Sequence, residues 1–168
     1  MFDIDFKFED IRVASICNKD ISTLEQWLQV QNNKDGFSQD NINLKEIRER
    51  YFESLISESE FFLKVLLKDE IIGIVKGRIE FKNINEVWIW YFIIDKDLRK
   101  EHLGSKIIDN LSAYFDTELG KYNMYSLVSA DNNESKSFWS CKGFQVIRVA
   151  KDYFDCDGDF VDMLIYKK

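Results

Sequence analysis

A short run of basic and small residues follows an apolar stretch in the segment IIDKDLRKEHLGSKII, residues 93–108. Arg99 and Lys100 add positive charge there, and Gly104 lies just before a helical spacing of apolar residues begins. The N-terminus of a helix has unpaired N–H groups and the positive end of the helix dipole, so it attracts phosphate groups. A glycine lets the backbone approach such a ligand closely. The segment predicts either a phosphate or pyrophosphate site or an ordinary turn with exposed basic residues.

A second pattern, NNESKSFWSCKGF, covers residues 132–144. It begins with Asn132, carries the aromatic pair Phe138 and Trp139, and ends in a Gly-Phe pair. The acidic residue three positions after Asp131 is typical of a capping box, which predicts that a helix begins here. A glycine such as Gly143 commonly ends a helix. A helix that begins at Asp131 and contains the aromatic pair is therefore expected.

The elements that must position these segments follow from the spacing of the apolar residues. The stretch VWIWYFII at 87–94 is apolar on both faces, which is typical of a central strand covered on both sides. A helix and another strand follow it, and such a unit makes a parallel strand pair. An α/β (α+β) fold is expected, with a mixed, mostly antiparallel central sheet and helices on both faces. The predicted strands are 11–16, 61–67, 71–81, 87–94, 124–130, 144–150 and 160–166, the predicted helices a short one from 22 and then 43–57, 103–119 and 131–143, and the predicted surface loop is 31–43.

The composition excludes several classes of function. The 168 residues carry 23 Lys+Arg against 30 Asp+Glu, a net charge of −7, and nucleic acids or anionic membranes would need a basic surface. His102 is the only histidine and the three cysteines lie far apart, so no metal site is expected. There is no signal-like N-terminus and no apolar run near the ~20 residues of a membrane span. A cytoplasmic protein with no nucleic-acid or membrane partner is expected.

Taken together, the two segments resemble the GNAT acyltransferase superfamily, whose members move an acyl group from coenzyme A to an amine. RKEHLG at 99–104 is similar to the family's pyrophosphate loop, Arg/Gln-x-x-Gly-x-Gly/Ala, which follows its fourth strand. NNESKSFWSCKGF is similar to the family's Asn-x-x-Ala-x-x-Phe-Tyr-x-x-x-Gly-Phe. The two occur in the family's order and separation, and the resemblance covers nearly the whole chain. A single GNAT-like acetyltransferase domain is therefore expected over residues 1–168.

The resemblance implies an acetyl-CoA site that is built mainly from backbone groups. The strand residues Phe92, Ile93 and Ile94 would offer hydrogen bonds to the pantetheine arm and the thioester carbonyl. Backbone amides of the following loop would hold the pyrophosphate. The residues of that loop are Arg99, Lys100, Glu101, His102, Leu103, Gly104 and Ser105. Asn132 would hydrogen-bond the pantetheine, and the helix that carries Phe138 and Trp139 would flank the cofactor.

Two residues depart from the family pattern. His102 stands where the family usually has its first loop glycine, and its side chain is accommodated if φ is negative there. It is interpreted as a phosphate contact or as a solvent-exposed residue. Trp139 stands where many members have a tyrosine that is thought to protonate the departing thiolate, and an indole cannot act as an acid near neutral pH. Tyr91 is a candidate for that acid, with Ser140 and Cys141 as alternatives.

The general base has one main candidate. Some family members carry a glutamate on the fourth strand, at the position that Trp88 occupies here. Glu86 lies two residues earlier and therefore on the same face of the strand. Through a water molecule it could take the proton that an ammonium group with a pKa of about 10 must lose before attack. Glu80 is a second candidate, and an exposed carboxylate at the strand end is the alternative interpretation of Glu86.

The resemblance implies an N-acetyltransferase that moves an acetyl group from acetyl-CoA to a primary amine by direct attack on the thioester. The acceptor would be a small-molecule or peptide amine, and a homodimer is common in the family. The departures at the loop glycine and the tyrosine leave an alternative, a non-catalytic acyl-CoA-binding or regulatory module.

Overall fold

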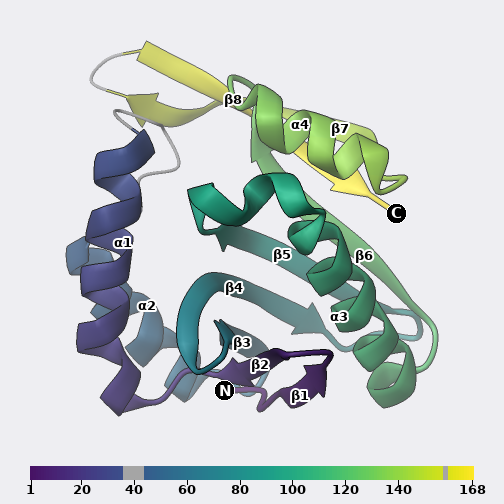
Figure 1. Ribbon diagram of the computed structural model, residues 1–168. Coiled ribbons are helices and arrows are strands. Elements are labelled where there is room, and N and C mark those ends of the chain that lie inside the picture. The colour runs from purple at the N-terminus through teal and green to yellow at the C-terminus, as the bar shows by residue number, and fades with distance from the viewer. Residues whose placement is uncertain (36–43, 157–158) are drawn as a thin grey trace.

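The computed structural model describes residues 1–35, 44–156 and 159–168 (Figure 1). Strands and helices alternate in an order that begins with a short hairpin and ends with a longer one. In chain order the elements are β1 Asp5–Phe8, β2 Ile11–Ser15, the 3-10 turn η1 Asn18–Asp20, α1 Ile21–Asp35, α2 Leu44–Ile56, β3 Glu60–Leu67, β4 Glu70–Glu80, β5 Asn85–Ile94, the 3-10 turn η2 Lys96–Glu101, α3 Leu103–Leu119, β6 Tyr122–Ser129, α4 Asn133–Cys141, β7 Gln145–Cys156 and β8 Asp159–Lys167.

The strands form one sheet in the order β1-β2-β3-β4-β5-β6-β8-β7. Within the described residues β5 and β6 pair in parallel and the other neighbouring strands pair antiparallel. Helix α3 connects the two parallel strands, as the strand–helix–strand spacing predicted. The prediction of a mixed, mostly antiparallel sheet is confirmed.

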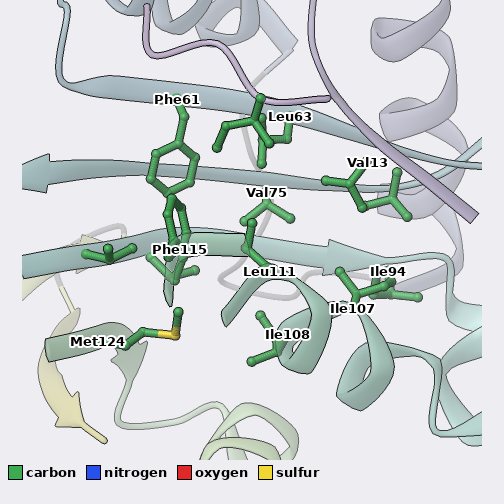
Figure 2. Packing of buried hydrophobic residues seen from close by; sticks show 14 of the residues in the cluster. Val13, Phe61, Leu63, Val75, Ile94, Ile107, Ile108, Leu111, Phe115 and Met124 are labelled. Carbon is green, nitrogen blue, oxygen red and sulfur yellow. The ribbon is translucent and has the colours of Figure 1, made fainter. Parts of the chain in front are cut away.

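Helices cover both faces of the sheet, and each face has its own apolar cluster. Helices α3 and α4 contribute to the larger cluster, where Phe115 packs against Phe61 of β3 with ring centroids 5.6 Å apart. Figure 2 shows Leu111 and Phe115 of α3 directed toward the strands that carry Phe61 and Val75. Helices α1 and α2 bury a second cluster on the opposite face. Each fully buried apolar side chain of this kind contributes about 1.5–3 kcal/mol to stability.

The N-terminal part of the chain differs from the sequence-based prediction in two respects. Strand β1 was not predicted, because four residues at a sheet edge with a half-exposed pattern give little periodic signal. Helix α1 continues through Asp35, over residues that were predicted to begin a surface loop. Its buried positions Leu24, Leu28 and Gln31 follow the spacing of one helical face. The buried face therefore continues beyond Leu28 to a polar residue. Residues 36–43 of that predicted loop lie outside the described part.

The centre of the sheet contains a bulge in β5. Lys76 of β4 pairs with Tyr91, but the next residue, Gly77, pairs with Ile89, so Trp90 is the extra residue on β5. Gly77 makes this close approach because it has no side chain. A Cβ at this position would lie 2.1 Å from the Trp88 carbonyl oxygen. The bulge therefore depends on a glycine in the strand beside it.

Gly77→Ala is expected to lower the free energy of unfolding by about 3 kcal/mol, because the added methyl group meets a ladder carbonyl that is held in place. Equilibrium urea unfolding measures the change. Gly143→Ala is the matched control, since nothing lies within 4 Å of a Cβ there and only its φ of +83° opposes the change. That control is expected to cost about 1 kcal/mol. Equal losses in the two variants would contradict this account of the bulge.

Candidate active site

The parallel pairing of β5 and β6 is short, and the two strands separate beyond it. Pairs run from Asn85 with Tyr122 to Ile89 with Ser126. Beyond Ile89, strand β5 pairs with β4 alone among the described residues, while the end of β6 pairs with β8. We call this separation, between residues 90–94 of β5 and 127–129 of β6, the fork. Backbone N–H and C=O groups that line a fork need partners from outside the sheet.

Two helices begin at the mouth of the fork, because the chain leaves each strand there and turns into a helix. Turn η2 and α3 follow β5, and α4 follows β6 (Figure 1). An ion pair joins the two exits, with Arg99 Nη1 of η2 3.2 Å from Glu134 Oε2 of α4. Arg99 Nε also donates to the Ile94 carbonyl, at 3.1 Å. The positive ends of two helix dipoles and a guanidinium therefore lie close together on an otherwise acidic protein.

The loop between β5 and α3 begins with a capped turn. The Asp95 carboxylate accepts a hydrogen bond from the Asp97 amide at 3.0 Å, and the Leu98 amide donates to the Asp95 carbonyl at 3.0 Å. Lys100 and Glu101 continue the turn as backbone, and their side chains lie outside the described residues.

His102 ends this turn and is the N-cap of α3 in the left-handed region, with φ +56° and ψ +11°. The negative φ under which a side chain would be accommodated without strain is therefore not found, and the histidine adopts a conformation that favours glycine. Histidine is among the residues that adopt it more often than most. Its side chain is solvent-exposed and gives the helix no capping hydrogen bond. A contact of His102 with phosphate stays a prediction.

Gly104 lies where α3, α4 and β5 come together. A Cβ on Gly104 would lie 3.3 Å from the Phe138 ring and 3.5 Å from the Phe92 ring. The Phe92 and Phe138 rings are 5.6 Å apart, and Trp139 packs edge-on against Phe138 at 5.1 Å. The glycine therefore keeps the first turn of α3 against an aromatic wall formed by Phe92, Phe138 and Trp139.

Several predicted cofactor-binding residues have side chains in the core. Ile94 and Leu103 belong to the α3–α4 cluster, and Ile93 packs at the cluster on the opposite face. Ser105 is partly buried in the first turn of α3. These residues can meet a ligand mainly through their backbone, which agrees with a site of backbone groups.

Asn132 is the N-cap of α4, one residue after Asp131, which the capping-box spacing predicted as the cap. Its Oδ1 accepts a hydrogen bond from the Ser135 amide at 2.9 Å. The side chain therefore supports the helix start beside the fork. The hydrogen bond to pantetheine that the resemblance implies stays a prediction.

The side chains at the candidate positions for the general acid lie in different environments. Trp139 is only 3% exposed and belongs to the core. Ser140 and Cys141 are exposed at the far end of α4, about 12 Å along the helix from its N-cap at ~1.5 Å per residue. Tyr91 lies on β5 within the fork and packs at the α1–α2 cluster. Of these side chains, Tyr91 alone lies on a strand of the fork.

Glu86 lies at the opposite end of β5 from the mouth of the fork. Its Oε2 accepts hydrogen bonds from Lys82 Nζ at 2.9 Å and from Trp88 Nε1 at 3.3 Å. The hydrogen bond from Lys82 is the main cause that lowers the pKa of Glu86, and that from Trp88 adds to it. Glu80 binds the same lysine at 2.8 Å. Glu86 is therefore a weaker proton acceptor than an ordinary glutamate, and its role as a base stays a prediction.

The sequence did not point to Gln31, which the structure places against the loop. Its side chain is 2% exposed and contacts Asp95 and Lys96, at the end of β5. A signal was present, since Gln31 continues the buried helical face of Leu24 and Leu28. A polar residue on such a face requires a buried partner.

Two further features concern the described part of the chain as a whole. Its histidine, cysteine, aspartate and glutamate side chains form no group of three or more that could hold a metal ion. No helix there is long and apolar enough to cross a membrane.

The chain matches a known family in sequence and solved acetyltransferases in structure. The family model for the acetyltransferase (GNAT) domain matches residues 13–165. A search of curated protein sequences gives no match.

Solved structures of acetyltransferases share the fold at low sequence identity. An acetyltransferase from Salmonella typhimurium that modifies the N-terminal serine of ribosomal protein L7/L12 has a TM-score of 0.81 at 15% identity, over 96% of this chain and 95% of that one. The ribosomal-protein-S5-alanine acetyltransferase from Vibrio fischeri has a TM-score of 0.76 at 17% identity, over 99% and 96%. The microcin C7 self-immunity acetyltransferase MccE, in complex with acetyl-CoA and AMP, has a TM-score of 0.77 at 16% identity, over 96% and 93%.

His102→Gly is expected to raise the free energy of unfolding by about 0.5–1 kcal/mol, because glycine adopts the left-handed conformation without Cβ strain, although it gains freedom in the unfolded chain. His102→Val is expected to lower it by more than about 1 kcal/mol, since a β-branched residue fits that region worst. Urea unfolding of both variants measures the order. A glycine variant less stable than the wild type would show that the imidazole itself stabilises the loop.

Proposed function

Because the chain belongs to the GNAT acetyltransferase family, we propose that it moves an acetyl group from acetyl-CoA to a primary amine by direct attack on the thioester. The observation that carries this proposal is the fork, where β5 separates from β6 beyond Ile89 and both following helices begin. In the reaction a C–N bond forms and the C–S bond breaks. The amine loses a proton, and coenzyme A leaves as its thiol or thiolate.

The residues at the fork fit such a cofactor. Residues 90–94 present a strand edge that pairs with no other strand on the β6 side within the described residues, so it can bind the amide groups of a pantetheine arm. The start of α3 combines a helix dipole with Arg99 nearby, which suits a pyrophosphate. Gly104 lets the first turn of α3 lie against the Phe92 and Phe138 rings, where a Cβ would be crowded. When bound, acetyl-CoA supplies the activated thioester.

The side chains around the fork support orientation more than proton transfer. Backbone N–H groups of β5 can polarise a carbonyl oxygen, and the wall of Phe92, Phe138 and Trp139 excludes water on the α3–α4 side. A thiol with a pKa of about 8–9 is a fair leaving group, so a strong acid is dispensable. Positioning of the two reactants therefore supplies most of the proposed rate enhancement.

The acceptor is proposed to be a primary amine, with the α-amino group of a peptide as the first class to test. Support comes from the two structurally similar enzymes whose names state a ribosomal-protein substrate. The second candidate function is a non-catalytic acyl-CoA-binding module. The observations that favour it are the buried Trp139 and the ion-paired Glu86.

Calorimetry with acetyl-CoA tests the proposal, and Asn132→Ser sharpens the test. Serine also caps a helix, so the variant is expected to keep its stability while it loses the amide group. Loss of one hydrogen bond of about 1.4 kcal/mol would weaken acetyl-CoA binding about tenfold. No binding by the wild type at millimolar cofactor would overturn the proposal. Binding without thiol release on a panel of peptides and small amines would favour the module.

Glu86→Gln is expected to lower kcat/KM by less than about tenfold, because its carboxylate is held by Lys82 and a working general base contributes about 10²–10⁴. Glu80→Gln, at the other carboxylate on Lys82, tests the second candidate in the same way. The pH profile of kcat/KM is measured for both. A hundredfold loss in Glu86→Gln alone, with loss of the rising limb of its profile, would establish Glu86 as the base.

A further inference from the structure

Gln31 of α1 makes two hydrogen bonds to the residues at which β5 becomes the loop. Its Nε2 donates to Asp95 Oδ2 at 2.7 Å, and its Oε1 accepts from the Lys96 amide at 3.1 Å. The side chain is 2% exposed, and 64 residues separate it from Asp95. One buried amide group therefore connects a helix of the opposite face to the start of the candidate phosphate-binding loop.

The contact extends into the loop through Asp95. The oxygen of Asp95 that Gln31 does not bind accepts from the Asp97 amide, and the Asp95 carbonyl accepts from the Leu98 amide. The next residue, Arg99, donates a hydrogen bond from Nε to the Ile94 carbonyl. The Asp95 carboxylate is thus hydrogen-bonded both to Gln31 of α1 and to the first turn of η2.

Another buried polar group on the same helix lacks a hydrogen-bond partner within the described residues. This group is Trp27 Nε1, one turn earlier. Both polar atoms of Gln31, in contrast, are matched with a donor and an acceptor of one turn. A glutamine that only filled space on the buried face of α1 would not need this two-sided match, because an apolar residue fills such a position at lower cost.

We propose that Gln31 is a positioning residue for the cofactor loop. Through Asp95 and Lys96 it holds the turn that presents the start of α3 to the pyrophosphate of acetyl-CoA, and it does not touch the cofactor itself. This inference rests on the function proposed above. It predicts that the affinity for coenzyme A depends on a side chain of α1, on the other side of the sheet from the aromatic wall.

The test compares Gln31→Met with Leu28→Val. The methionine fills a similar volume and removes both hydrogen bonds, whereas Leu28 lies one turn earlier on the same buried face and packs in the α1–α2 cluster. In calorimetry, Gln31→Met is expected to bind coenzyme A about tenfold more weakly, which corresponds to a loss of about 1.4 kcal/mol in binding free energy. It is also expected to speed hydrogen exchange at the Asp97 and Leu98 amides and to raise KM for acetyl-CoA more than it lowers kcat. Leu28→Val is expected to change that affinity by less than about twofold while it lowers the urea midpoint.

A double variant that exchanges the amide and carboxylate side chains of positions 31 and 95 tests whether the lost affinity for coenzyme A can be recovered. Gln31→Glu alone places a second carboxylate against Asp95 and is expected to weaken binding further. Combined with Asp95→Asn, it restores one donor and one acceptor at the contact and is expected to recover most of the affinity. This double variant separates the specific contact from a general loss of stability.

The outcomes distinguish failure of the positioning role from failure of the proposed function. If the wild type binds coenzyme A and Gln31→Met binds equally well, the positioning role is overturned and the proposed function stands. Equal weakening in Gln31→Met and Leu28→Val also overturns it, because helix stability would then explain both. If the wild type binds no coenzyme A, the proposed function fails and the positioning role fails with it.

Discussion

The early end of the β5–β6 ladder is the constraint on which the rest of the candidate site depends. Two parallel strands pair over five residues, Asn85–Ile89 with Tyr122–Ser126, and beyond them β5 and β6 no longer pair with each other among the described residues, although β5 still pairs with β4 and β6 with β8. The chain must then turn into a helix from each strand, so two helix N-termini meet at one place. A ligand with amide groups and phosphates matches both features, since it can complete the strand edge and satisfy the helix starts. The bulge at Trp90, made by Gly77, lies at the same point of β5.

If the proposed site is built mainly from backbone groups, its side chains are free for packing, which would explain how the chain tolerates its departures from the family pattern. Trp139 replaces a tyrosine and serves as part of the aromatic wall, next to Phe138 and Phe144. His102, at the position where the resemblance implies a glycine, adopts a left-handed backbone conformation, at the cost of some strain. Gly104 could not be exchanged so easily, because a Cβ would press on the Phe138 and Phe92 rings. The residues most important for the proposed site are those, such as Gly104, whose size controls how closely neighbouring segments of the chain approach one another.

Local spacing predicted much of the fold, whereas contacts between distant segments were outside its reach. The apolar run of β5 and the stripe of α3 each follow from neighbours in the sequence, and each is confirmed. The cap of α4 lies at Asn132, one residue after the predicted Asp131. The end of the β5–β6 ladder is a property of pairing between strands that α3 separates. The ion pair of Glu86 with Lys82 and the contact of Gln31 with Asp95 are likewise decided in three dimensions. Glutamine in a polar stretch indicated a loop, and only the buried face of α1 shows why it belongs to a helix.

Hydrogen exchange of the β5 amides with and without coenzyme A tests the central claim most directly. If the fork is the cofactor site, coenzyme A slows exchange at residues 90–94, where the strand has no partner on the β6 side among the described residues, and at the start of α3. Residues 85–89, already paired on both sides, serve as the internal reference and are expected to change little. Protection elsewhere on the protein, with residues 90–94 unchanged at saturating coenzyme A, would contradict the account.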